Sequence, residues 1–143
     1  MADTLTPAAR SERMSRIRGT DTRPELLLRK NLHAMGMRYK LHDKRLPGRP
    51  DLVFPRYKAV VLVHGCFWHR HGGCKVASTP KSNVEFWQRK FAANVARDKI
   101  NAQALAALGW SVIVVWECEV NTPAKARETA ASVARRLRAA SET

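Results

Sequence analysis

Metal-binding residue types crowd one short segment of this chain and constrain its fold more than any other feature. Two cysteines and two histidines fall between residues 66 and 74, and a third cysteine, Cys118, follows a late apolar run. Zinc prefers four soft or borderline ligands in tetrahedral geometry. Such a set is available in Cys66, His71, Cys74 and Cys118. Four protein ligands leave no position for water, so the pattern predicts a structural zinc site that ties the loop to the sheet.

Spacing alone leaves the histidine ligand open, because His64 and His69 lie near the same cysteines as His71. Three isolated buried cysteines are the competing interpretation. It is weaker because Gly72 and Gly73 make this loop hydrophilic and prone to turns. The odd number of cysteines also argues against a disulfide framework.

A single domain of the α/β class is expected, since 143 residues can bury a core and no linker or repeat divides the chain. Thr22, Pro24 and Glu25 have the form of a capping box at the start of a helix. The apolar spacing predicts helix 22–35, strand 37–41, a hairpin of strands 51–54 and 59–63, helix 83–108, strand 111–116 and helix 122–140. Residues 22–143 would form this domain.

Residues 1–21 are polar, basic and poorly periodic, which predicts a flexible N-terminal arm. Met14 and Ile17 lie at helical spacing within it, and the arm could become ordered on binding.

The charge of the chain indicates a polyanionic partner. The formal net charge is +14 and the sequence pI is near 10.7, with most basic side chains in residues 10–58 and 70–99. Nucleic acid is the strongest candidate, because Lys and Arg contact phosphates, and a basic surface without a specific partner is the alternative. No apolar run approaches the length of a membrane span or secretory signal, so no membrane association and a cytoplasmic location are expected.

Carboxylates and histidines suggest hydrolytic chemistry. Asp51 follows a glycine-containing turn, and the chain also offers Glu25, His64, His69 and Asp98. Phosphodiester hydrolysis needs a metal that polarises phosphoryl oxygens and a base that deprotonates water. The structural alternatives are a turn-capping Asp51, a helix-capping Glu25 and an Asp98 paired with a basic side chain on its own helix.

Two aromatic pairs, Phe67–Trp68 and Phe86–Trp87, lie in or beside polar segments. Exposed aromatic wedges can stack between bases and unstack a duplex step. Core packing is the favoured interpretation for Phe86 and for two further aromatic residues, Trp110 and Trp116.

The motifs that carry these residues are LPGRPD at 46–51, HGCFWH at 64–69, EFW at 85–87 and WEC at 116–118. Together with Asn94, Arg97 and Asp98, this combination resembles the very short patch repair (Vsr) DNA mismatch endonucleases over roughly residues 10–120. The resemblance implies a restriction-endonuclease-like domain with a mixed central sheet flanked by helices. It also implies a strand-specific nick 5′ to the thymine of a T:G mismatch that arises when 5-methylcytosine deaminates.

The resemblance assigns roles by matching position. Asp51 would bind the catalytic Mg²⁺ together with the main-chain oxygen of Val63, and His69 would activate the attacking water. Asp98 would orient His69, while Glu25 and His64 would complete the metal and phosphate surroundings. The family zinc site matches the four ligands named above.

The resemblance also implies how the chain meets its partners. Phe67, Trp68 and Trp87 would intercalate beside the mismatch, and Met14 and Ile17 would insert from the other groove. The implied partner is duplex DNA with a T:G mismatch, bound by a monomer, with MutL and a cytosine methyltransferase as companions and a nucleoid-associated location.

Three details depart from the expected pattern: Val63 stands where a well-known member has Thr, the 72–74 loop is one residue longer, and no ExK pair follows Asp51. The last departure favours a histidine-based variant over an ordinary restriction enzyme. A sequence-specific restriction-type nuclease that breaks both strands, and a non-catalytic zinc-stabilised DNA-binding module, are the alternative functions.

Overall fold

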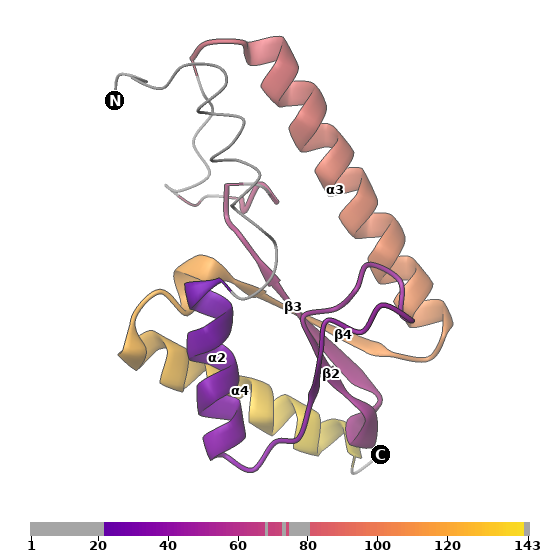
Figure 1. Cartoon of the computed structure of the whole chain (residues 1–143), viewed down its shortest axis with the longest axis vertical. Helices are drawn as coiled ribbons and strands as arrows, with labels where there is room; N and C mark the ends of the chain where they lie inside the picture. Colours follow the sequence, from indigo (N-terminus) through magenta and orange to yellow (C-terminus); the bar gives the residue numbers. More distant parts are fainter. Residues whose placement is uncertain (1–21, 68, 73, 75–80, 142–143) are drawn as a thin grey trace.

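The computed structural model describes residues 22–67, 69–72, 74 and 81–141 (Figure 1). The predicted order of helices and strands is confirmed within them. The arm at 1–21, with Met14 and Ile17, and Trp68 lie outside the described residues. The elements are α2 (Arg23–Ala34), β1 (Lys40–Leu41), β2 (Leu52–Phe54), β3 (Ala59–His64), α3 (Val84–Ala107), β4 (Ser111–Trp116) and α4 (Pro123–Ser141).

The four strands form one mixed sheet in the order β1-β2-β3-β4. β2 and β3 make the predicted antiparallel hairpin, turned by a short 3-10 helix at Pro55–Tyr57. β3 and β4 are parallel, and the crossover between them carries α3. Parallel strands need such a long connection, whereas antiparallel neighbours do not.

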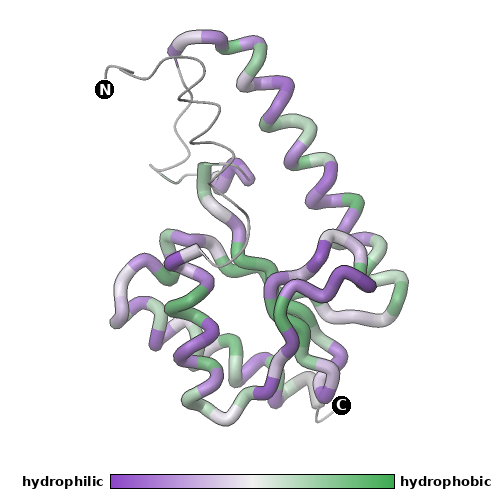
Figure 2. The backbone as a smooth tube through the Cα atoms, in the orientation of Figure 1, coloured by the Kyte–Doolittle hydropathy of each residue, from purple (hydrophilic) through white to green (hydrophobic). Residues whose placement is uncertain are grey.

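Alternate residues of the strands pack on opposite faces of the sheet, as the period of two requires. Leu52, Val61 and Ile113 belong to the larger core cluster, which α2 and α4 complete. Val53 and Val60 point the other way and pack with Leu105 from the last turns of α3. The helices therefore flank the sheet on both sides, and the central strands form the most hydrophobic part of the tube (Figures 1 and 2).

Local signals set the ends of the helices. The Thr22 hydroxyl accepts a hydrogen bond from the main-chain N–H of Glu25 at 3.4 Å, as expected for an N-cap. Gly36 and Gly109 follow α2 and α3 with φ of 84° and 90°, the left-handed conformation that commonly ends a helix. Among the described helices, none is long and apolar enough to cross a membrane.

α3 is 24 residues long, and its first half extends beyond the sheet (Figure 1). Its other end packs against β4, so the helix projects from a fixed base. The loop after β3 and the loop after β4 emerge at the same edge, because His64 and Trp116 are register partners. Functional side chains gather at this edge.

The turn before Asp51 fits closely against α3. Gly48 has φ of 73°, and a Cβ placed there would lie 2.8 Å from Nδ2 of Asn101. Gly48→Ala therefore meets both backbone strain and a steric clash, and we expect it to lower the free energy of unfolding by about 2 kcal/mol or more.

Gly36→Ala is the matched control, since Gly36 has φ of 84° and a Cβ added there would meet no atom within 4 Å. It should show the backbone cost alone, about 1 kcal/mol. Adding Asn101→Ala to Gly48→Ala should recover only part of the difference in urea denaturation, because it removes Nδ2 and Cγ but leaves Cβ of residue 101 at 2.9 Å from the added methyl group. Equal losses for the two alanine variants would contradict the close fit.

Candidate active site and metal centre

A cleft of about 700 Å³ opens where β3 ends, between the 47–49 turn and the side of α3. Its walls carry carboxylates, imidazoles and cations from segments far apart in the sequence. These are Asp51, His64, His69 and Asp98, with Arg49, Lys90 and Arg97. Three cationic side chains in one cleft favour an anionic ligand.

The carboxylate of Asp51 is nearly buried, with 9% of the residue exposed, and its Oδ2 accepts a hydrogen bond from the N–H of Val63 at 2.7 Å. It therefore lies against the main chain of the residue expected to share its metal. Burial and the neighbouring Glu25 carboxylate raise the pKa of Asp51 to about 8. Two carboxylates in one buried site repel when both are ionised, and a divalent cation would relieve that repulsion.

Arg29 and His42 hold the Glu25 carboxylate in place, and the sequence did not predict either contact. This carboxylate receives a hydrogen bond from Arg29 at 3.0 Å, and both of its oxygens lie 3.1 Å from Nε2 of His42. The main-chain N–H of His42 in turn donates to the carbonyl of Asp51. Glu25, His42 and Asp51 offer ligand atoms close enough for one metal ion. Glu25 is thus more than a helix cap, because only 1% of it is exposed and its carboxylate faces this group.

A second group, His64, His69 and Asp98, lines the same cleft. Nδ1 of His69 donates to Oδ2 of Asp98, so Asp98 pairs with a side chain of the loop after β3. The rings of His64 and His69 stack with centroids 4.0 Å apart and planes 6° apart. Burial, together with the neighbouring His69, lowers the pKa of His64 to about 4. His64 is therefore neutral at pH 7.

Aromatic side chains join the loop after β3 to α3. The ring of Phe67 makes edge contacts with Trp87 at 5.7 Å and Phe91 at 5.1 Å. The guanidinium of Arg70 lies 4.1 Å from the ring centroid of Phe91, and its Nη1 donates to the carbonyl of Phe67. The core interpretation of Phe86 is wrong, because 51% of this residue is exposed at the projecting end of α3.

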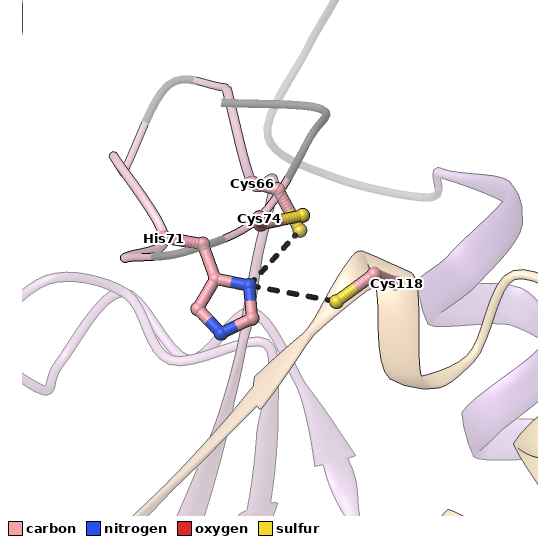
Figure 3. Close-up of side chains that lie close together, drawn as sticks. All are labelled: Cys66, His71, Cys74 and Cys118. Carbon is pink, nitrogen blue, oxygen red and sulfur yellow. Dashed lines mark hydrogen bonds between the residues drawn. The ribbon is translucent and has the colours of Figure 1, made fainter. Parts of the chain in front are cut away.

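The predicted zinc ligands meet at one point between the two loops (Figure 3). Nδ1 of His71 lies 3.6 Å from Sγ of Cys66 and 3.5 Å from Sγ of Cys118, and Sγ of Cys74 lies beside that of Cys66. Bonds of about 2.3 Å to sulfur and 2.0–2.1 Å to nitrogen in a tetrahedron separate S and N by about 3.6 Å. The donor set therefore fits a zinc ion, and it selects His71 from the three histidines.

Burial and the crowded thiols raise the pKa of Cys66 to about 12 and raise that of Cys118. Thiols in this state are protonated, and a bound metal would displace their protons. The N–H of Cys66 donates to Oε1 of Glu117 at 2.8 Å, which fixes the first ligand to the end of β4.

Trp116 was expected in the core, but it is half-buried and lies between the two groups of histidines. Its ring stacks on His71 at 4.3 Å and meets the edge of His64 at 5.3 Å. Its position directly before Glu117 and Cys118 was the signal available in the sequence.

Comparison with known proteins gives a consistent set of relatives. A family model described as "DNA mismatch endonuclease Vsr" matches residues 2–75. "Type II nicking enzyme V.XorIIP" of Xanthomonas oryzae pv. oryzae is 50% identical over 121 residues, which cover 85% of this chain and 88% of that protein. "DNA mismatch endonuclease Vsr" of Escherichia coli K12 is 42% identical over 118 residues, covering 82% and 75%. "Type II nicking enzyme V.NmeAIP" of Neisseria meningitidis is 46% identical over 128 residues, covering 90% and 91%.

The raised pKa of Asp51 predicts how stability depends on pH. A carboxyl whose pKa is about 8 in the folded chain, against an ordinary 3.8, favours the folded state when protonated. Without divalent cations in the buffer, the free energy of unfolding should therefore fall as the pH rises from about 4 through about 8.

Asp51→Asn mimics the neutral carboxyl and keeps an oxygen for the Val63 N–H. Its stability relative to the unsubstituted chain should rise between pH 5 and pH 9 by more than about 1.4 kcal/mol, the equivalent of one pKa unit. Urea denaturation at both pH values measures this. Parallel pH profiles for the two proteins would show that Asp51 is not protonated in the fold.

Proposed function

The chain belongs to the Vsr family of DNA mismatch endonucleases, and from this membership and the geometry of the cleft we propose that it nicks duplex DNA 5′ to the thymine of a T:G mismatch. The reaction adds water across one phosphodiester P–O bond. The proposal assigns residues 22–143 to a restriction-endonuclease-like catalytic domain and residues 1–21 to a DNA-binding arm. In this scheme the product has one broken strand, as required to start very short patch repair of deaminated 5-methylcytosine.

One observation carries the proposal: the Asp51 carboxylate and the His69–Asp98 pair line the same cationic cleft, and the buried Glu25 carboxylate lies directly behind Asp51. Asp51 and Glu25 suit a hard divalent cation, since both offer oxygen ligands in a nearly buried site. When bound, Mg²⁺ would polarise a phosphoryl oxygen and offset the charge that develops there. The cleft thus holds the two kinds of group that phosphodiester hydrolysis needs.

Asp51 and the main-chain oxygen of Val63 would hold this ion, because the Asp51 carboxylate already contacts the Val63 peptide. His42 and Arg29 keep the Glu25 carboxylate turned towards the same site. These contacts fix Glu25 before any DNA arrives, which lowers the entropic cost of assembling the site.

His69 is the proposed general base. Because its Nδ1–H is held by the Asp98 carboxylate, Nε2 of the neutral ring is left to accept a proton from the attacking water. Asp98 also stabilises the imidazolium that forms. His64 stays neutral beside His69 and avoids a second positive charge that would weaken the base.

The aromatic residues fit a wedge for a distorted duplex. The Phe67 ring lines the cleft, and it joins the loop after β3 to the projecting half of α3 through its edge contact with Trp87. Rings there can stack on bases that a mismatch leaves weakly held. The proposal keeps Trp68, Met14 and Ile17 as further intercalating residues, all outside the described part of the chain.

Lys90 and Arg97 line the cleft from α3, and Arg49 lines it from the opposite wall. They give the DNA backbone cationic contacts on both sides. The proposed partner is duplex DNA bound by a monomer, with MutL as a further partner and the nucleoid as the place of action.

A sequence-specific nicking or restriction activity without a mismatch is the second candidate. The names of two relatives, both called Type II nicking enzymes, favour it. The non-catalytic DNA-binding module has less support, because such a module has no use for a nearly buried carboxylate pair or an oriented histidine.

The nicking assay uses duplexes that carry T:G or T:A in a panel of flanking sequences, with Mg²⁺. We expect one cut strand in the T:G duplex and an intact T:A duplex. Asp51→Ala should lower kcat by at least about 100-fold while DNA binding is kept, because it removes the proposed metal ligand. Asp43→Ala is the matched control, since the Asp43 carboxylate pairs with Arg45 and is not among the residues lining the cleft.

Equal cutting of both duplexes would favour the sequence-specific candidate, and breaks in both strands would favour a restriction-type enzyme. Binding without cleavage by the unsubstituted chain would support the non-catalytic module.

We further predict one structural zinc per chain, measured by elemental analysis. His71→Ala should lose the metal and lower the free energy of unfolding by at least about 2 kcal/mol, because the site links the ends of β3 and β4. His33→Ala, at an exposed position on α2, should keep both metal and stability. A folded preparation of the unsubstituted chain without metal would contradict this prediction.

A further inference from the structure

Trp116 touches histidines of both functional groups. Its ring centroid lies 4.3 Å from that of His71, with planes 10° apart, which is a stacked pair. It lies 5.3 Å from the His64 ring with planes 76° apart, which is an edge contact. Both arrangements are favourable for aromatic rings.

The next contact continues the series. The His64 ring stacks on the His69 ring with centroids 4.0 Å apart, and Nδ1 of His69 is hydrogen-bonded to Asp98 of α3. Four rings therefore follow one another from the four-ligand metal centre to the proposed general base. His71 and Cys66 belong to the metal centre, whereas His64 and His69 belong to the cleft.

The backbone holds Trp116 at this place. It is the last residue of β4 and the register partner of His64 in the parallel ladder. Its N–H donates to Oε1 of Glu119 at 2.9 Å, which fixes the chain where the strand ends. The main chain of Trp116 is thus held by the strand pairing and by Glu119, and its indole starts from a fixed point.

We propose that Trp116 is a positioning residue through which the Cys/His metal centre sets the orientation of the His64–His69 pair. The inference rests on the proposed function, because it gives the metal centre an effect on the same site. A metal bound at Nδ1 of His71 would fix that ring, and the fixed ring gives Trp116 a flat surface to stack on. The edge contact of Trp116 with His64 then limits where His64, and with it the stacked His69, can lie.

Loss of the Trp116 ring should slow the chemical step and leave the affinity for DNA unchanged. Misplacing a reacting group by about 1 Å can cost about 100-fold in rate. Trp116 is not among the residues lining the cleft, so its loss should leave DNA contacts in place. The effect should therefore appear in kcat and not in KM.

Three variants test this in the full-length, zinc-loaded chain. Trp116→Leu removes the ring, and Trp116→Phe keeps a smaller one. Trp110→Leu is the matched control, because it removes the same side chain at the opposite end of β4, where Trp110 contacts Lys58 and the second core cluster. Zinc content, kcat and KM for the nick, and the NMR signals of ¹³C-labelled histidines are measured for each.

We expect Trp116→Leu to keep one zinc and its KM within about twofold, to lose at least about tenfold in kcat, and to shift the ring signals of His64 and His69. Trp116→Phe should restore most of the kcat, and Trp110→Leu should match the unsubstituted chain in kcat and in these signals. Unchanged kcat and histidine signals in Trp116→Leu would overturn the inference. Loss of zinc in proportion to activity would also overturn it, because Trp116 would then only support the metal centre.

The histidine signals and the zinc content do not depend on nicking. If the unsubstituted chain fails to nick a T:G duplex, the proposed function fails. The shift of the His69 signals in Trp116→Leu, with zinc retained, still decides whether Trp116 positions the pair, because His69 is one ring further along the series, whereas loss of the indole changes the His64 signals directly.

Discussion

The parallel pairing of β3 with β4 is the interaction on which the rest of this structure depends. Its register places His64 opposite Trp116, so the loops that follow the two strands leave the sheet side by side. One loop supplies three side chains of the Cys/His cluster, and the other supplies Cys118. The same register brings Glu117 to the N–H of Cys66. A shift of one residue would turn these side chains to the opposite face of the sheet and separate the two groups.

Stability and chemistry are placed on different parts of the molecule. The large core lies between the sheet and the helices α2 and α4, and it contains most of the fully buried hydrophobic residues of the described chain. The cleft is built from the strand ends, the 47–49 turn and one side of α3 between Lys90 and Leu105. Glu25 crosses this division, because it sits on a core helix but turns its carboxylate to Asp51. The larger core thus fixes one of the groups that the proposed chemistry needs.

The sequence predicted the order of the helices and strands, and the structure brings the four predicted zinc ligands into one cluster, because both features follow from local or chemical rules. Cap residues, apolar spacing and glycine positions mark the helices and strands. Three thiols and one imidazole are a ligand set typical of a structural zinc site. The sequence could not predict which rings would stack. The roles of His42, Arg70 and Trp116 depend on cross-strand register and on side chains from elements distant in sequence. Phe86 was misplaced because its helix extends beyond the sheet, so an apolar residue near its start has no core to enter.

The buried carboxylates explain why the fold tolerates an otherwise unfavourable arrangement. The Glu25 carboxylate pairs with the Arg29 guanidinium and the His42 imidazole, whereas the Asp51 carboxylate accepts from the Val63 N–H and its burial raises its pKa. The two carboxylates therefore differ in how far their negative charge is already compensated by neighbouring groups. Asp51 is the group that gains most from a cation, while Glu25 is already fixed in place. Because of this difference, the Asp51 site can accept a divalent ion although the fold does not need the ion there. The separate Cys/His cluster is the site where a metal would stabilise the fold. Metal dependence of the proposed reaction and metal dependence of stability would thus arise at different places in one small domain.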